Sequence, residues 1–202
     1  MVMKRNTRKL AVLAFIAALM IIVAMTPLGY LAIGPVGISF NTIPVTIGAI
    51  TLGPACGAIL GIIFGFTSFL FSTSPIIQIM RSLNLLLGGL VCFLPRILEG
   101  ILAGYISRGF GKTKIPKPVT YGATGLITAF FNTVLFAAGV LLVFGNSQEI
   151  MEMWTELAPD RNALVFICAL TGTAAVIEWS ATALVTSAVC SALYKSKLLR
   201  GI

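Results

Sequence analysis

The sequence predicts an all-α membrane protein with six transmembrane helices in a single domain, residues 1–202. Of its 202 residues, 58% are hydrophobic and only 10% are charged, and the mean hydropathy is +1.03. This composition is typical of integral membrane proteins and excludes an ordinary soluble domain. A spanning helix needs about 20 apolar residues, so the length allows six spans with short loops and leaves no room for a second, water-soluble domain.

The first predicted helix is the apolar run Leu10–Met25, which follows a basic segment at residues 4–9. Signal peptides share this pattern, but no convincing small-x-small cleavage site follows and the sequence stays hydrophobic, which favours a retained helix. Ala14 and Ala18 form a small-residue face suited to close contact with another helix. That helix would be either internal or part of another subunit.

The second and third predicted helices flank a turn at residues 53–54. Gly29–Phe40 is too apolar for an ordinary solvated turn and is expected to fold back into the membrane. Thr42–Leu52 would form a short second span, and Pro54–Phe71 a third span with proline at its first position. One face of this third span carries glycines at four-residue spacing, where a second helix can approach closely. The glycines of this stripe are Gly53, Gly57, Gly61 and Gly65.

Polar residues interrupt the apolar character just before this glycine stripe. Asn41, Thr42 and Thr46 stand close to Pro44 in the sequence. This pattern is typical of a short or broken helix whose freed polar groups face protein or a water-filled cavity instead of lipid. Such a cavity could bind a solute.

The remaining segments alternate between loops and three further spans. A polar loop precedes the fourth span, a basic loop follows it, and an acidic loop with four of the six acidic residues separates the fifth span from the sixth. In chain order they are the polar loop Ser72–Asn84, the fourth span, which ends near Ser107, the basic loop Arg108–Pro118, the fifth span Val119–Phe144, the acidic loop Gly145–Asn162 and the sixth span Ala163–Tyr194.

The placement of the basic residues predicts the orientation. Eleven of the fourteen Lys and Arg residues lie in the amino-terminal segment, the basic loop and the carboxyl-terminal tail, which a six-span chain places on one side. By the positive-inside rule that side is cytoplasmic, so we predict that both termini are cytoplasmic. The three other loops then lie outside, over a bundle with polar residues at depth, which describes a pocket open to the exterior.

Several kinds of function are disfavoured. Histidine is absent, which removes histidine-based catalysis, proton relays and metal ligation. The segment 111–113 resembles the end of a phosphate-binding loop, but Ile106 stands where the leading glycine would be. The basic segments lack interleaved aromatic residues, which argues against nucleic acid as a partner. The cysteines are scattered singly, as small buried hydrophobes would be: Cys56, Cys92, Cys168 and Cys190. We therefore expect no enzymatic activity, no metal and no cofactor.

Three charged residues inside the predicted spans are candidates for substrate binding. A charge at membrane depth costs at least about 2.5 to 3.5 kcal/mol and needs a partner or a purpose. Arg96 and Glu99 lie three residues apart on one helix face. Either they pair with each other and orient the fourth span, or Arg96 binds an anionic substrate while Glu99 balances the charge or accepts a hydroxyl. The same two interpretations apply to Glu178.

Four amide side chains complete the candidate substrate-binding set. Asn41 and Asn132 could orient an amide- or hydroxyl-bearing solute in an otherwise apolar pocket, although Asn132 could equally satisfy a backbone group. Gln78 and Asn84 lie in the polar outer loop, where they would either contact the solute or be part of a solvated loop.

Three stretches together resemble the substrate-binding S component of energy-coupling factor (ECF) vitamin transporters, closest to the pantothenate-type branch. They are GPVGISFNTIPVTIGAITLGPACGAILGIIFGFTS, LPRILEGILAGYI and FFNTVLFAAGVLLVFG. The resemblance covers about Leu10–Gly145, and the sixth span agrees by position only. One departure concerns Glu99, where the family pattern leads us to expect an apolar residue, so that an anionic vitamin would meet an extra negative charge.

The resemblance implies a six-helix subunit of the prokaryotic plasma membrane that captures a vitamin from outside. It implies a membrane scaffold (T) subunit with two cytoplasmic ATPases as partners, which would hydrolyse the ATP, while the S component tips in the membrane to release its cargo. In that family small alanines of the first helix face the scaffold, a role that Ala14 and Ala18 match. The alternative is a self-contained secondary transporter or channel that uses Arg96, Glu99 and Glu178 as coupling charges, although so short a chain shows no convincing inverted repeat.

Overall fold

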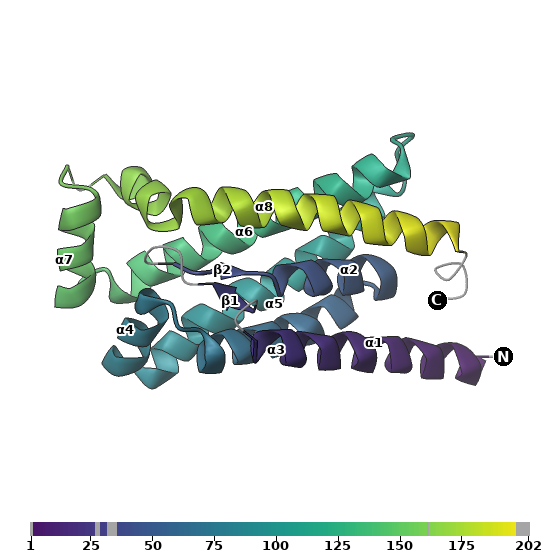
Figure 1. Ribbon diagram of the computed structural model, residues 1–202, viewed down its shortest axis with the longest axis horizontal. Helices are drawn as coiled ribbons and strands as arrows, with labels where there is room; N and C mark the ends of the chain where they lie inside the picture. Colours follow the sequence, from purple (N-terminus) through teal and green to yellow (C-terminus); the bar gives the residue numbers. More distant parts are fainter. Residues whose placement is uncertain (1, 27–28, 32–35, 161, 197–202) are drawn as a thin grey trace.

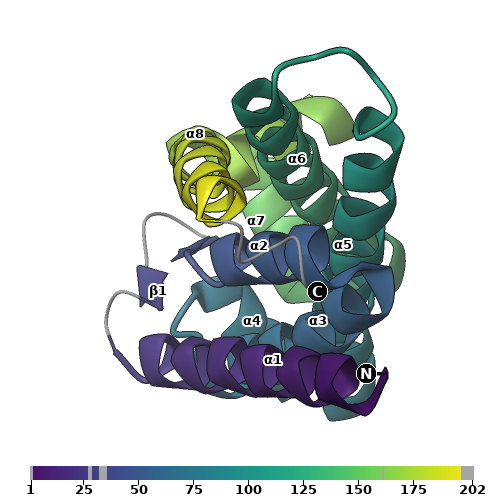
Figure 2. The ribbon, with the colours of Figure 1, turned by 90° about the vertical axis from the view of Figure 1, so that its right-hand side faces the viewer.

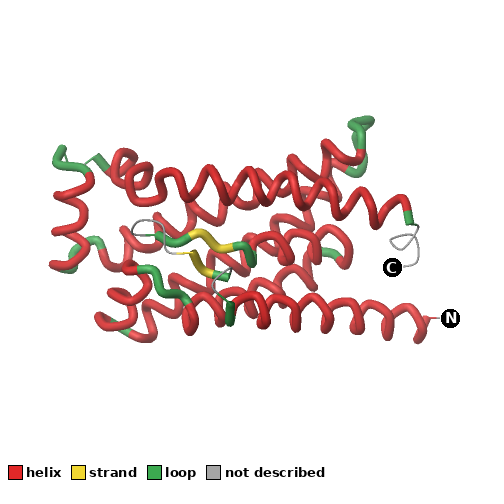
Figure 3. Tube along the Cα trace, in the orientation of Figure 1, coloured by secondary structure: helices red, strands yellow, loops and turns green. Residues whose placement is uncertain are grey.

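The computed structural model describes residues 2–26, 29–31, 36–160 and 162–196 of the chain. Within these ranges the chain forms eight helices and one pair of short strands (Figure 1, Figure 3). The elements are α1 (Val2–Ala24), β1 (Tyr30–Leu31), β2 (Ile38–Ser39), α2 (Thr42–Leu52), α3 (Pro54–Phe71), α4 (Pro75–Leu83), α5 (Leu85–Phe110), α6 (Lys117–Phe144), α7 (Gln148–Leu157) and α8 (Ala163–Lys195).

The long helices run side by side along the long axis of the molecule, so the bundle has two distinct ends (Figure 1). One end, which we call the basic end, holds the start of α1, the α2–α3 turn, the α5–α6 loop and the end of α8. The opposite end holds α4 and the acidic helix α7. The predicted gathering of basic segments at one end is therefore found among the described residues, whereas Lys197 and Arg200 of the tail lie outside them.

Five of the described helices are long and apolar enough to cross a membrane: α1 from Asn6, α3, α5, α6 and α8 from Leu164. The second predicted span, Thr42–Leu52, is helix α2 with the predicted bounds. Its 11 residues cover about 16 Å, roughly half of the hydrocarbon core. Five of the six predicted spans are thus helices long and apolar enough to cross a membrane, and the second is a shorter apolar helix.

The short helix α2 continues a chain segment that enters the bundle as a strand. β1 and β2 pair antiparallel, with Tyr30 opposite Ser39, and the chain turns at Asn41 before α2 begins. Helix α2 contacts all five long helices and lies in the middle of the bundle when it is viewed along its axis (Figure 2). This arrangement fits the expected re-entrant loop and broken helix, although residues 32–35 of that loop lie outside the described part of the chain.

The predicted glycine stripe is confirmed as a packing seam between α3 and α5. A Cβ atom at Gly57 would overlap the carbonyl of Gly100, and one at Gly61 would overlap the carbonyl of Arg96. Gly53 has a different role, because its φ of 100° allows the tight turn between α2 and α3. The seam brings the α5 backbone against α3 and thereby fixes the height and rotation of Arg96 in the bundle.

Two loop predictions were wrong, because Ser72–Asn84 contains α4 and Gly145–Asn162 contains α7. Both helices are amphipathic and cover one end of the bundle (Figure 1). They share a hydrophobic core with the first part of α8, which is broken at Gly172 by a φ of 46°. The buried members of this core from these three segments are Ile76, Ile77, Met80, Ile150, Phe166 and Leu170.

We predict that Gly61→Ala destabilises the protein by about 1–3 kcal/mol, because the added methyl group forces α3 and α5 apart. Thermal unfolding in detergent, followed by tryptophan fluorescence, should show an apparent Tm lowered by several degrees. Gly89→Ala on α5 is the matched control, since a Cβ atom there meets nothing within 4 Å. Equal unfolding temperatures for the two variants would contradict the seam.

Candidate substrate-binding site

Five of the predicted site residues are buried in the middle of the bundle and come from four helical segments. The exposed fractions of these residues are 0% for Asn41, 6% for Arg96, 0% for Glu99, 5% for Asn132 and 8% for Glu178. They belong to the start of α2, to α5, to α6 and to α8. We call these five residues the core cluster.

Arg96 projects between aromatic side chains of two neighbouring helices. Its guanidinium carbon lies 4.3 Å from the ring centroid of Phe136 on α6 and 5.5 Å from that of Phe64 on α3. Such cation–π contacts hold the planar group in place without using its N–H donors. The Nε and Nη1 atoms of Arg96 have no hydrogen-bond partner in the described structure, so a preorganised pair of donors is available.

Glu99 lies one turn further along α5 and is completely buried. Neither of its carboxylate oxygens has a hydrogen-bond partner in the described structure. Arg96 and Glu178 both interact electrostatically with Glu99, but no hydrogen bond joins Arg96 to Glu99. The hydrogen-bonded ion pair that would only orient the fourth span is therefore not present.

Asn41 belongs to a small network beside the arginine. Its Nδ2 donates to the hydroxyl of Tyr30 at 3.4 Å and to Thr67 Oγ1 at 3.5 Å, and these two hydroxyls lie 3.0 Å apart. The Oδ1 atom of Asn41 has no partner, and neither does Oδ1 of Asn132 on α6. Each amide therefore presents one free acceptor in the core.

Glu178 differs from Glu99 because its carboxylate is fully occupied by protein donors. The hydroxyl of Thr42 donates to Oε1 at 2.8 Å, and the backbone N–H of Ser39 donates to Oε2 at 3.2 Å. The carboxylate lies at the amino-terminal end of α2, where the helix dipole favours a negative charge. Glu178 thus ties the strand–helix junction to α8 and positions Asn41 between them.

Buried threonines extend the core cluster towards the basic end, and sequence reasoning did not identify them. On α6 they recur every four residues from Asn132, and on α8 every four residues from Glu178. A four-residue spacing places polar side chains on one helix face, so these threonines could have been predicted from the sequence. The threonines are Thr120, Thr124, Thr128, Thr182 and Thr186, with Thr46 of α2 bonded to Thr128.

Gln78 and Asn84 lie apart from the core cluster. Gln78 is exposed on α4 and donates to the carbonyl of Thr73 at 2.7 Å. Asn84 is exposed as the N-cap of α5 and accepts from the backbone N–H groups of residues 86 and 87 at 3.1 and 3.0 Å. The structure gives both side chains local partners at the end of the bundle opposite the basic end.

Ala14 and Ala18 are exposed on the outer face of α1. They are therefore accessible at the surface of the described chain. Of the two interpretations given for this small-residue face, contact with another subunit is the one that the structure leaves open.

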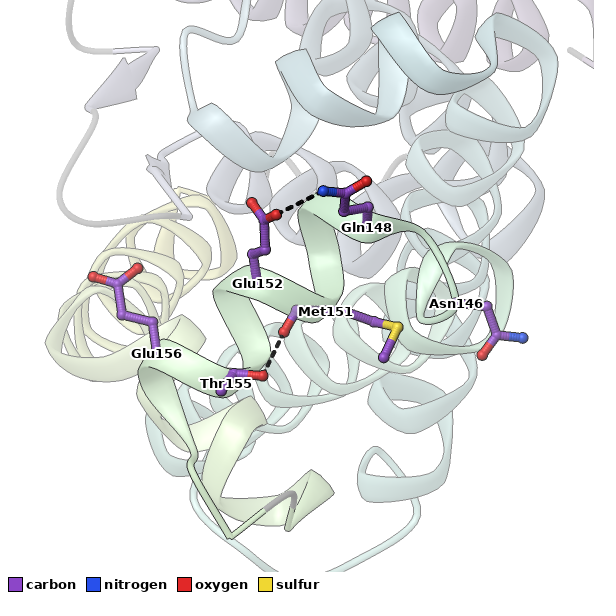
Figure 4. A pocket seen from close by; sticks show the side chains of 6 residues that line it. All are labelled: Asn146, Gln148, Met151, Glu152, Thr155 and Glu156. Atoms are coloured by element: carbon purple, nitrogen blue, oxygen red, sulfur yellow. Dashed lines mark hydrogen bonds between the residues drawn. The ribbon is translucent and has the colours of Figure 1, made fainter.

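A wide surface depression of about 640 Å³ lies over α7 and is unrelated to the core cluster (Figure 4). Its polar side chains are exposed, and two of its hydrogen bonds are internal to the helix, from Gln148 to Glu152 at 3.0 Å and from Thr155 to the carbonyl of Met151 at 2.9 Å. Because it is open and acidic, it is poorly suited to an anionic solute. The core cluster is therefore the candidate binding site.

Two comparisons with known proteins found matches to this chain. A family model described as the substrate-specific component of ECF transporters matches residues 8–195. The chain is also similar to the pantothenic acid transporter PanT of Lactococcus lactis subsp. cremoris (strain MG1363). The two are 25% identical over 207 residues, which cover 96% of this chain and 97% of that protein.

We predict that Glu178→Ala lowers the unfolding temperature, because it leaves the Thr42 hydroxyl and the Ser39 N–H buried without an acceptor, at about 1–3 kcal/mol per group. In a double-mutant cycle in detergent, Glu178→Ala and Thr42→Val should be less than additive. Thr155→Val on the exposed face of α7 serves as the control and should be additive with Glu178→Ala. Additivity of the first pair would contradict the positioning role of Glu178.

Proposed function

The chain belongs to the substrate-specific components of ECF transporters, and we propose from this premise that it captures a carboxylate-bearing vitamin, with pantothenate as the favoured ligand. The coarser conclusion, a vitamin-transport subunit of the cell membrane that is not an enzyme, follows from the family and from the apolar spanning helices. The choice of pantothenate is supported by the similarity to a pantothenic acid transporter and by the chemistry of the core cluster.

The observation that carries the proposal is the unpartnered guanidinium of Arg96. An arginine within a spanning helix is costly, and this one lies between two aromatic rings with its Nε and Nη1 atoms free. A planar guanidinium matches a carboxylate in bidentate geometry, and charge-assisted hydrogen bonds of this kind are the strong ones. A carboxylate ligand would accept hydrogen bonds from this guanidinium and balance the buried charge.

The orientation of the bundle supports capture from outside the cell. The basic end carries the positive charges expected on the cytoplasmic side of a membrane protein, and the opposite end carries α4 and α7. We therefore propose that both termini are cytoplasmic and that the ligand enters from the end covered by α4 and α7.

Transport would require partners. We propose that the exposed face around Ala14 and Ala18 docks on a membrane scaffold (T) subunit that carries two ATPases. Small residues on a lipid-facing helix allow the close backbone approach that drives helix association in membranes, where the hydrophobic effect does not. The small-residue face of α1 is available for such a contact.

Arg96→Ala should weaken binding of pantothenate by more than tenfold, because the ligand carboxylate loses a bidentate, charge-assisted contact. Isothermal titration calorimetry on purified protein in detergent measures this effect. Arg108→Ala is the matched control, since Arg108 is an exposed arginine at the basic end of the same helix. An unchanged affinity in well-folded Arg96→Ala would contradict the proposed role of Arg96.

Ala14→Leu and Ala18→Leu should spare pantothenate binding but abolish assembly with the scaffold and ATP-driven uptake in proteoliposomes. Ala14→Ser, which keeps the side chain small, is the control and should assemble normally. The same reconstitution tests the alternative function. Uptake by this chain alone, driven by a proton or sodium gradient without the ATPases, would establish a secondary transporter and remove the importer-subunit proposal.

A further inference from the structure

The core cluster contains four buried acceptor oxygens without a donor: Oε1 and Oε2 of Glu99, Oδ1 of Asn41 and Oδ1 of Asn132. The Nε and Nη1 atoms of Arg96 likewise have no acceptor. These residues are all at least nine-tenths buried. Buried polar atoms in proteins are nearly always hydrogen-bonded, and leaving one unsatisfied costs about 1–3 kcal/mol. These unsatisfied atoms therefore describe what a bound ligand has to supply.

A ligand carboxylate would accept hydrogen bonds from Arg96 but would supply no donor to the four oxygens. They would remain without donors unless other parts of the same ligand carried O–H or N–H groups. Glu99 is the most demanding of these residues, because both oxygens of its carboxyl group lack a partner. Glu178 shows the contrast, since its oxygens already receive protein donors.

The free acceptors are also spread over separate elements. Asn41 precedes α2, Glu99 lies on α5 and Asn132 lies on α6, so one compact donor such as an ammonium group would not serve all three. On α5 itself, Arg96 and Glu99 are three residues apart, which separates the origins of their side chains by about 5–6 Å. A ligand that contacts both must carry its anionic group at one place and hydrogen-bond donors at others.

From this inventory we infer that Glu99 is a specificity-determining residue that accepts the hydroxyl hydrogens of the ligand, and that the substrate class is a monocarboxylate with several separate O–H or N–H donors. This inference rests on the proposed function and deepens it. Glu99 thereby selects for donor-rich carboxylates, because a ligand with a carboxylate but without hydroxyls would leave its buried oxygens unsatisfied.

Three compounds separate the two ends of the ligand. Pantothenate has a carboxylate, an amide N–H and two hydroxyls; panthenol keeps the N–H and these hydroxyls but replaces the carboxylate with an alcohol; N-acetyl-β-alanine keeps the carboxylate and the N–H but lacks the hydroxyls. Panthenol therefore tests Arg96 and the proposed function, and N-acetyl-β-alanine tests Glu99. β-Alanine, a carboxylate with an ammonium group, tests a single compact donor.

We expect the unmodified protein to bind pantothenate at least a hundredfold more tightly than N-acetyl-β-alanine and β-alanine in competition titrations. We expect Glu99→Gln to weaken pantothenate binding by at least tenfold while it leaves binding of N-acetyl-β-alanine unchanged, because an amide has only one acceptor oxygen and presents donors in place of the other. Glu152→Gln, an exposed carboxylate on α7, is the matched control and should bind all ligands normally.

The outcomes distinguish the two proposals. No pantothenate binding, or equal binding of panthenol, overturns the proposed function. Tight pantothenate binding that Glu99→Gln leaves unchanged overturns the role of Glu99 and keeps the proposed function. If Glu99→Gln fails to fold, the unmodified protein still decides, since equal affinity for pantothenate and N-acetyl-β-alanine would overturn the donor requirement, and so would tight binding of β-alanine.

Discussion

The whole arrangement depends on the rule that polar groups inside a membrane must find partners within the protein. The junction between β2 and α2 breaks the regular backbone pattern in the middle of the bundle, and Glu178 compensates by accepting from Ser39 and Thr42. This contact allows an 11-residue helix to stand where a full span would otherwise be needed. The shortened helix leaves the polar residue at its start, Asn41, at the depth of the core cluster.

The opposite wall of the cluster depends on close packing instead of hydrogen bonds. The α3–α5 seam brings two backbones together at Gly57 and Gly61, and the same stretch of α5 carries Arg96 and Glu99. The aromatic rings of Phe64 and Phe136 then hold the guanidinium from α3 and α6. One side of the core cluster is thus positioned by the carboxylate of Glu178 and the other by the glycines of the α3–α5 seam. The free donors and acceptors lie between these two sides.

Sequence reasoning succeeded where the signal was local and periodic. The bounds of α2 and α3, and the glycine stripe, follow from proline and glycine positions within one stretch of chain. The partners of Glu178 could not be predicted in this way, because Ser39 is 139 residues away in the sequence. The sequence predicts loops in place of helices α4 and α7 because short amphipathic helices show too few apolar residues to stand out among polar ones. The threonines beyond Asn132 were missed because hydroxyls in an apolar run weigh little in a hydropathy pattern.

The contact of Gly61 with the carbonyl of Arg96 also affects how genetic data on this protein would be interpreted. A substitution in the seam displaces the arginine together with its helix, so a screen for vitamin auxotrophy would score Gly61 as if it were a ligand contact. Residues of α3 that never touch the solute would then appear on a functional map beside those that do. Only separate readings of protein abundance and of affinity would tell the two groups of alleles apart.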